Sequence, residues 1–230
     1  MQYFPMDPTI LILIPALLLG MWAQSAVNSR YRQYSQVLSQ RNISAYDAAK
    51  MILQGAGAYN VGIEMAKGSG LSDHFDPKAN VLRLSQGVMH STSIAAIGIA
   101  AHEAGHALQY QQGYFPIRIR SMLIPACSIG SNLAWPLFFV GILMASDLLL
   151  GIGIALYLVA VLFQLITLPV EFNASRRAIQ ILQGSGILSP TEIPGVRKVL
   201  SAAAMTYVAA TVNAAANLLR MFTLANRRRS

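Results

Sequence analysis

Two histidines and a glutamate stand out as residues whose types and spacing could do chemistry. His102 and His106 are four residues apart, so on a helix their side chains lie one turn apart on the same face. Their imidazole nitrogens can therefore converge on one metal ion. Glu103 points to an adjoining face, from which its carboxylate can reach a water beside that metal. This H-E-x-x-H pattern predicts a zinc site for hydrolysis, with His102 and His106 as ligands and Glu103 as the general base.

The residues around this motif favour a metal over the alternative, which is a pair of helix histidines satisfied by hydrogen bonds. Residues 94–101 are apolar and small, and they lead directly into the motif. A histidine pair on so apolar a helix has to be buried or bound, because an unpaired buried imidazole costs free energy. Gly113 follows as a helix stop. We therefore expect a helix that carries a metal site and ends near Gly113.

A hydrolytic zinc site takes three protein ligands and keeps one position for water, so a third ligand is needed. Glu171 is favoured because it continues an apolar segment, where an unpaired carboxylate is expensive. The alternative role for Glu171 is a salt bridge to Arg176 or a charge at the membrane interface. Ser175, one helical turn further on, or Asn173 could orient a ligand histidine. Other acidic residues and histidines expected on the same side of the membrane stay open as ligands: Asp47, Glu64, Asp73, Asp76, Glu192, His74 and His90.

The composition is typical of an integral membrane protein. Hydrophobic residues make up 54% of the 230 residues and charged residues only 11%, and the mean hydropathy is +0.47. A soluble surface carries more charge than this, since about a quarter of the residues of soluble proteins are charged. The net charge of +8 does not indicate a nucleic-acid partner, because the basic residues flank apolar segments. The single Cys127 lies inside an apolar segment and is expected to pack there.

Apolar segments predict three to four transmembrane helices. Residues 9–23 form a first span, and residues 121–145 and 148–170 form a membrane hairpin. Residues 201–224 are either a fourth span, which we favour, or a helix packed at the site or at the membrane interface. Arg30, Arg32 and Arg41 follow the first span, so the positive-inside rule places the next segment in the cytoplasm. The hairpin returns the chain to the side it left, so Glu171 and the histidines share the cytoplasmic side.

Between the first span and the metal helix, the pattern predicts a helix and then a small sheet. Ser44 is expected to cap the helix, with Asp47 in the capping-box position. Residues 61–65 and 81–85 alternate like strands, and a turn at 68–70 and a turn-rich loop at 73–80 separate them. A β-hairpin or small sheet should thus precede the metal helix. Its outer edge could accept an extended peptide, or the sheet could serve packing alone.

The fold class expected is a mainly α membrane protein with a small sheet, and the elements divide the chain into four parts. These are an N-terminal transmembrane anchor (1–24), a cytoplasmic metalloprotease part with the H-E-x-x-H helix (25–120), a transmembrane hairpin (121–170), and a third-ligand helix with a cytoplasmic loop and a C-terminal apolar helix (171–230).

Three segments together resemble the YugP-like neutral zinc metallopeptidases of bacterial membranes. They are A-H-E-A-G-H-A at 101–107, D-H-F-D-P at 73–77 and P-V-E-F-N-A-S-R-R-A at 169–178. This resemblance spans nearly the whole chain. More distantly, the chain is similar to the HtpX and CAAX prenyl protease class, and the resemblance has consequences for the site. It implies a zincin-like part of the gluzincin type with one Zn2+ per chain, held by His102, His106 and Glu171. That class usually has Asp at the position of Ser175.

The leading hypothesis is a membrane-embedded zinc endopeptidase of the bacterial inner membrane, which could act in membrane protein quality control. Expected partners are membrane lipids and a polypeptide substrate that is membrane-associated or unfolded, and the oligomeric state stays open. Two alternatives are a non-catalytic, zinc-stabilised scaffold or chaperone-like binding protein, and a metal-handling membrane protein. Glu103 argues against the first, and spans nearly free of charge argue against the second. A donor to the oxyanion is expected from among His74, Tyr110, Arg176 and Tyr207.

Overall fold

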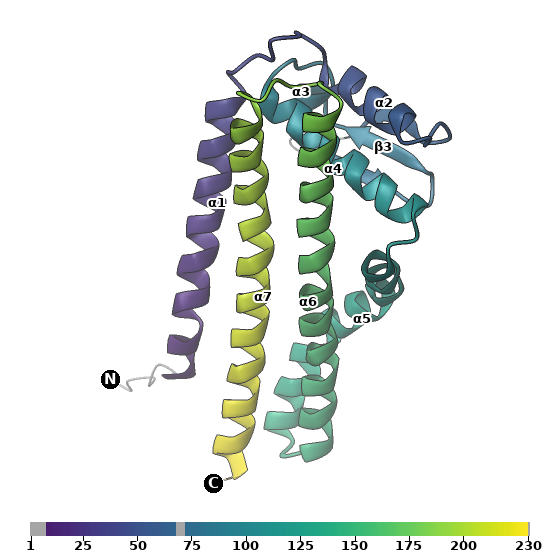
Figure 1. The fold of residues 1–230 in the computed structure, drawn as a ribbon. Helices are drawn as coiled ribbons and strands as arrows, with labels where there is room; N and C mark the ends of the chain where they lie inside the picture. Colours follow the sequence, from purple (N-terminus) through teal and green to yellow (C-terminus); the bar gives the residue numbers. More distant parts are fainter. Residues whose placement is uncertain (1–7, 68–71, 230) are drawn as a thin grey trace. The chain divides into compact units, whose positions relative to one another are not determined.

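The computed structural model describes residues 8–67 and 72–229, and these residues are mainly helical (Figure 1). The turn expected at 68–70 lies outside the described residues. In chain order the elements are η1 (Pro8–Ile12), α1 (Ile14–Tyr34), α2 (Ala45–Gly55), β1 (Gly62–Met65), β2 (His74–Asp76), β3 (Val81–Leu84), α3 (Gln86–Met89), α4 (Ile94–Gln111), α5 (Phe115–Leu143), α6 (Asp147–Gly184) and α7 (Ile193–Arg229).

Contacts group the described residues into two compact units. The first, here called the helical unit, takes the described parts of Met1–Ala23, Ile119–Leu168 and Thr206–Ser230. The second, here called the site unit, is formed by the described parts of Gln24–Arg118 and Pro169–Met205. The helices α1, α5, α6 and α7 each contribute residues to both units.

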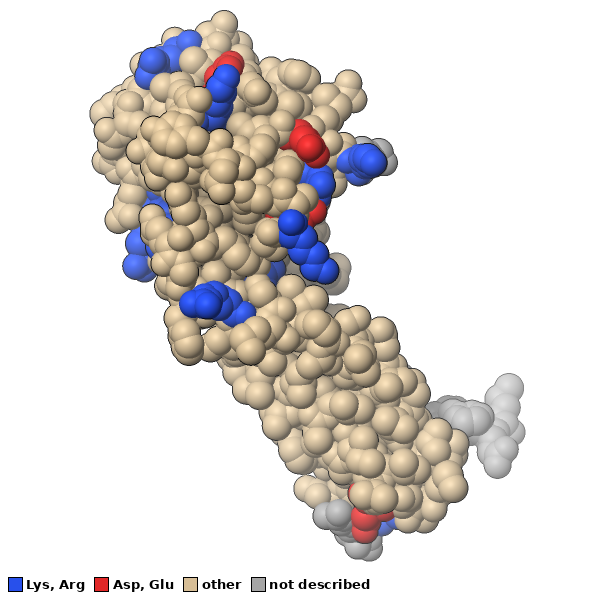
Figure 2. Space-filling view, turned by 90° about the vertical axis from the view of Figure 1, so that its right-hand side faces the viewer, with Lys and Arg blue, Asp and Glu red and all other residues tan. Residues whose placement is uncertain are grey.

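Four helical segments are long and apolar enough to cross a membrane. They are Pro8–Tyr34, Phe115–Leu143, Asp147–Gly184 and Ile193–Arg228. Each corresponds to one of the apolar segments predicted from the sequence, although the second helix ends at Leu143, before the predicted end at residue 145. Leu143 and Leu148 are 84% and 73% exposed, and Figure 2 shows a long stretch of surface without Lys, Arg, Asp or Glu. Such a surface suits lipid better than water, because lipid imposes no cost on exposed apolar side chains. The last apolar segment, 201–224, therefore lies in a helix that qualifies as a fourth span.

Small residues allow close helix packing inside the helical unit. A Cβ at Gly153 in α6 would lie 2.9 Å from the carbonyl oxygen of Ala134 in α5. Phe138 of α5, Leu150 of α6 and Met221 of α7 form a buried cluster around this contact. Glycines that let backbones approach closely are typical of helix interfaces in membranes.

The predicted small sheet is present, but its strands do not pair as a hairpin of residues 61–65 with 81–85 would. β1 and β3 are parallel, with Gly62 opposite Val81, so these two strands do not form a hairpin. β2 lies in the segment predicted as a loop and pairs antiparallel with β3, which gives the strand order β1-β3-β2. An ion pair between Asp76 and Arg83 joins β2 to β3. Alternation identifies a strand but not its partner or direction, and a strand of three residues is too short to show alternation.

The site unit packs around α4. The helices α2 and α3 and the strands β2 and β3 all contact α4, whose Ala100, Ala101 and Ala104 are fully buried. As predicted, Ser44 caps α2: its Oγ accepts a hydrogen bond from the Asp47 N–H at 3.1 Å. Also as predicted, α4 stops before Gly113, which has a φ of +64° that glycine adopts without strain.

Candidate metal centre

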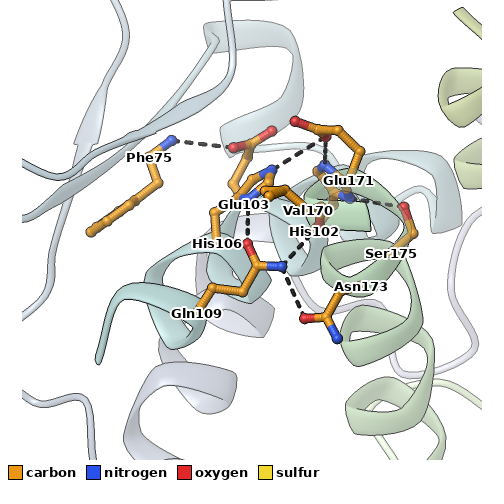
Figure 3. Close-up of polar contacts among 9 residues, drawn as sticks. All are labelled: Phe75, His102, Glu103, His106, Gln109, Val170, Glu171, Asn173 and Ser175. Atoms are coloured by element: carbon orange, nitrogen blue, oxygen red, sulfur yellow. Dashed lines mark hydrogen bonds and ion pairs between the residues drawn. The ribbon is translucent and has the colours of Figure 1, made fainter. Parts of the chain in front are cut away.

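Glu171 of α6 meets the two histidines of α4 at one point (Figure 3). Its Oε2 lies 3.2 Å from the Nε2 of His102 and 3.4 Å from the Nε2 of His106. One potential ligand atom from each residue lies within 4.8 Å of the others. Zinc bonds of about 2.0–2.1 Å in a tetrahedron place neighbouring ligand atoms about 3.3 Å apart. The two distances from Glu171 to the histidine nitrogens therefore match this spacing, and all three donor atoms lie close enough together to surround one ion.

Two of the three side chains are buried in the site unit, and His102 is partly buried. Glu171 is 2% exposed and His106 is 8% exposed. A carboxylate this buried requires compensation, because burial of an ionised group is costly unless it is paired or coordinates a metal. Two imidazoles and a divalent cation would together provide that compensation.

The second nitrogen of each ring has its own hydrogen-bond partner. His102 Nδ1 lies 3.1 Å from Ser175 Oγ, and His106 Nδ1 lies 2.9 Å from Gln109 Oε1 (Figure 3). The amide of Gln109 is held in turn, since its Nε2 donates to the carbonyl oxygen of Val170 at 2.8 Å and to Asn173 Oδ1 at 2.9 Å. Partners of this kind hold the ring in the tautomer that leaves Nε2 for a metal. Both rings are thus aimed at the point where Glu171 lies.

Gln109 is the residue of this network that the sequence analysis missed. Ser175 contacts a ring as expected, while Asn173 acts one step back, through Gln109. The available signal was the position of Gln109, three residues after His106 and therefore on the same helix face. A glutamine at that spacing is common on helices, so the signal becomes specific only once α6 is placed beside α4.

A close approach of two backbones brings these residues within reach. A Cβ at Gly105 would lie 2.9 Å from the carbonyl oxygen of Ala174 and 3.4 Å from its Cα. Gly105 lies between the histidines in the chain, and Ala174 lies one residue before Ser175. The absence of a side chain at Gly105 therefore allows α4 and α6 to come close enough for the histidines to reach Glu171.

Glu103 has a different environment from that of the three clustered residues. It is partly buried, and its Oε2 accepts a hydrogen bond of 3.2 Å from the backbone N–H of Phe75 in β2 (Figure 3). Burial raises the pKa of Glu103 above the usual value; the two histidines oppose this shift and Glu171 adds to it. A carboxylate with a raised pKa is a stronger base, suited to proton transfer near neutral pH.

The other residues that were open as ligands have structural partners or are exposed. Asp76 and Glu64 pair with Arg83, and Asp73 accepts a hydrogen bond from the Ser85 N–H at 2.7 Å. Glu192 accepts hydrogen bonds from the backbone N–H groups of Ser189 and Gln40 at 2.7 and 2.8 Å, and Asp47 serves the cap of α2. His74 and His90 are exposed. Within the described residues, the group of three possible metal ligands that converge on one point is His102, His106 and Glu171.

The four candidate oxyanion donors have different surroundings. Tyr110 has its ring 5.5 Å from the ring of Phe75, and Arg176 lines a cleft between α6 and α7. His74 Nδ1 lies 2.7 Å from the carbonyl oxygen of Ser72, and Tyr207 belongs to the helical unit. The choice among them stays a prediction.

Comparison with known proteins identifies the family. The family model described as "Putative neutral zinc metallopeptidase" matches residues 9–226. The chain belongs to this zinc metallopeptidase family. It is 46% identical over 211 residues to the "Putative membrane protease YugP" of Bacillus subtilis (strain 168), which covers 92% of this chain and 93% of that relative. The resemblance inferred from the three segments is thus confirmed, and no solved structure matches the chain.

Membership of a zinc metallopeptidase family agrees with the chemistry of the site. The family implies zinc, and two imidazoles with one carboxylate are a donor set typical of hydrolytic zinc centres. Four helices are long and apolar enough to cross a membrane, and the relative is named a membrane protease. Both observations indicate a membrane protein. The predictions of a zinc peptidase and of a membrane protein are therefore confirmed at this level.

Proposed function

We propose that this protein is a membrane-embedded zinc endopeptidase with a centre of the gluzincin type. One Zn2+ is held by His102, His106 and Glu171, and Glu103 is the general base. The observation that carries the proposal is the convergence of one ligand atom from each of three residues within 4.8 Å, together with a second carboxylate that the Phe75 N–H holds. A purely structural zinc site has no need of that second carboxylate.

The chain's own residues account for the proton transfers of peptide hydrolysis. Zinc, when bound, supplies a Lewis acid that polarises the peptide carbonyl and makes water more acidic. Glu103 takes a proton from the water whose oxygen bonds to the carbonyl carbon. The carbon–nitrogen bond then breaks, and Glu103 delivers the proton to the leaving nitrogen. Because the Phe75 N–H holds Oε2, we assign Oε1 of Glu103 to these transfers.

An extended polypeptide along β2 is the substrate that this arrangement favours. β2 is an edge strand, and the Phe75 N–H points away from β3 towards Glu103. A peptide that paired with this edge of β2 would pass beside the general base. Pairing through the backbone does not read sequence, which suits unfolded or membrane-associated polypeptides and a role in membrane protein quality control.

The proposed location of the site is the cytoplasmic face of the bacterial inner membrane, in a multi-pass protein. Arg30 and Arg32 lie at the end of the first candidate span, and Arg118 and Arg120 lie near the start of the second. Arg176 and Arg177 follow the apolar part of α6. Basic residues next to membrane spans favour the cytoplasmic side.

Substitution of the general base tests the function. The full-length protein in detergent or lipid nanodiscs, loaded with zinc, should cleave a denatured protein such as unfolded casein. Glu103→Gln should bind one zinc per chain and reduce kcat by at least about a hundredfold, because the proton acceptor is lost. The control is Glu64→Gln, which removes an exposed carboxylate of β1 and should retain activity. Equal activity of Glu103→Gln and the control would overturn the mechanism.

Substitution of the third ligand tests the centre separately. Glu171→Ala should lose bound zinc as measured by metal analysis of the purified protein, since two histidines alone bind zinc weakly. One zinc per chain at unchanged affinity would show that another residue completes the centre. A protein that binds zinc through all three residues but cleaves no polypeptide would favour the scaffold alternative.

A further inference from the structure

A cleft separate from the metal centre lies between α6 and α7, within the site unit. Its volume is about 510 Å³. Its wall combines apolar side chains, among them Phe172, Leu200 and Met205, with two arginines, Arg176 and Arg197. The cleft is therefore neither wholly apolar nor wholly polar.

The two arginines are available to a ligand. Both are exposed, and among the described residues neither has an ion-pair or hydrogen-bond partner. The pattern contrasts with Arg83, which pairs with two acidic side chains, and with Arg177, which donates to Asn173 at 2.7 Å. Two unpaired guanidinium groups on one cleft attract an anion, and a phosphate accepts paired hydrogen bonds from each.

Along both helices, the apolar side chains of the cleft lie nearer the apolar membrane segment, and the arginines lie farther from it. On α6, Phe172 directly follows the apolar segment that ends at Val170, and Arg176 comes one helical turn later. On α7, Met205 lies near the start of the apolar C-terminal segment 201–224, and Arg197 lies about two turns before Met205. At 1.5 Å per residue, Arg176 is about 9 Å along the helix from Val170, which is close to the thickness of about 5–8 Å of the headgroup layer outside the hydrocarbon core. On each helix the apolar wall is thus closer to the membrane segment than the arginine is.

We propose that this cleft binds an anionic phospholipid. The phosphate of the headgroup pairs with Arg176 and Arg197, and an acyl chain lies against Phe172, Leu200 and Met205 towards the apolar segments of α6 and α7. Basic pockets between membrane helices are suited to anionic headgroups. A free phosphate would satisfy the arginines but leave the apolar wall uncovered, so the whole cleft fits an amphiphile. This inference does not depend on the proposed proteolysis.

The cleft also borders the metal centre through one side chain. Ser175 lines the cleft, and its Oγ lies 3.1 Å from His102 Nδ1. A lipid in the cleft therefore lies one side chain away from a zinc ligand.

Native mass spectrometry of the full-length, detergent-solubilised protein tests the proposal. Phosphatidylglycerol should remain bound at one molecule per chain, and phosphatidylcholine should not. The double variant Arg176→Gln with Arg197→Gln should bind phosphatidylglycerol at least about tenfold more weakly, because both phosphate partners are lost. Ser201→Trp keeps both arginines but fills the cleft from an exposed position in its wall, and should weaken binding as well.

The matched control is Arg32→Gln with Lys198→Gln, which removes the same charge at exposed positions outside the cleft and should bind like the unmodified protein. Equal zinc content and monodispersity of all variants show that they are folded. Unchanged binding by the cleft variants, equal binding of phosphatidylcholine, or full displacement of the lipid by inorganic phosphate would each overturn the proposal. The last result would mean that the arginines serve a free anion.

Discussion

Gln109 links the two helices of the metal centre through a single side chain. Its Oε1 holds the Nδ1 of His106, while its Nε2 is fixed by Val170 and Asn173 of α6. The orientation of the His106 ring, a proposed ligand on α4, therefore depends on the placement of α6. Glu171, the third member of the cluster, comes from that same stretch of α6.

Substitution Gln109→Ala should weaken zinc binding by about 10- to 100-fold, because His106 loses the partner that fixes its ring. Competition with a chelator of known zinc affinity measures this change. Gln111→Ala, two residues further along the same helix at an exposed position, is the control and should leave the affinity unchanged. Equal affinities for the two variants would mean that Gln109 does not orient the ligand.

The charge state of His106 makes the stability of the metal-free fold and the strength of zinc binding change in opposite directions with pH. Burial lowers the pKa of His106, but the hydrogen bond to Glu171 and the charges of Glu103 and Glu171 outweigh burial, so the pKa is raised above its usual 6.5. Without zinc, the protonated histidine stabilises the fold below its unfolded pKa, and this contribution is lost as pH rises through the folded pKa. Zinc requires the unprotonated ring, so its binding strengthens over the same range.

The increase in melting temperature caused by zinc should therefore be small near about pH 5.5 and larger near about pH 8. Thermal unfolding of the detergent-solubilised protein, with zinc and with a chelator, measures the difference at each pH. A zinc effect that is constant from acid to mild alkali would contradict a histidine ligand whose pKa is raised.

Between elements, the distance from α4 to α6 is set where Gly105 faces Ala174. A methyl group at position 105 has no room, since it would meet a backbone carbonyl at 2.9 Å that cannot rotate away as a side chain can. Ala is otherwise the better helix former by about 1 kcal/mol. Sterics and helix propensity thus act in opposite directions at this position.

Substitution Gly105→Ala should lower stability by about 1–3 kcal/mol and weaken zinc binding, because overpacking forces the two helices apart. Thermal unfolding and metal analysis provide the measurements. Gly55→Ala is the control: nothing lies within 4 Å of a Cβ at that exposed end of α2, so the change should be neutral or slightly stabilising. A Gly105→Ala protein as stable and as rich in zinc as the control would show that the close approach is not required.

Across the full chain, the continuous helices α6 and α7 join apolar membrane segments to the site unit. Glu171 follows the apolar part of α6 without a break in the helix. The proposed third metal ligand is thus carried directly by a candidate membrane span. The proposed topology then requires that the α5–α6 turn and the α6–α7 turn lie on opposite sides of the membrane.

Single cysteines test this topology in a Cys127→Ser background in intact cells. Met144→Cys, at the exposed α5–α6 turn, should react with a membrane-impermeant maleimide from outside the inner membrane. Ser185→Cys, at the exposed end of α6, should react only after the membrane is permeabilised. Labelling of both positions from the same side would contradict a hairpin that crosses the membrane twice.

Several features of the fold were predictable because they depend on short stretches of chain. The four apolar segments, the Ser44 cap and the stop at Gly113 follow from local composition and from the preferences of single residues. The parallel pairing of β1 with β3 and the strand β2 were not predictable in this way. Pairing depends on which strands meet in space, and alternation within one strand contains no information about that.

The order of residues along the chain was enough to identify the histidine pair that could hold a metal and the carboxylate between them. A spacing of four residues places two side chains on one helix face, whatever the rest of the chain does. The packing of α6 against α4 was needed to select the carboxylate that joins the pair, and to show that Gln109 and Ser175 hold the rings. Glu171 lies far from His102 in the chain, and the contact between them exists because Gly105 lets the two helices approach. A distance between residues so far apart in the chain is a property of packing.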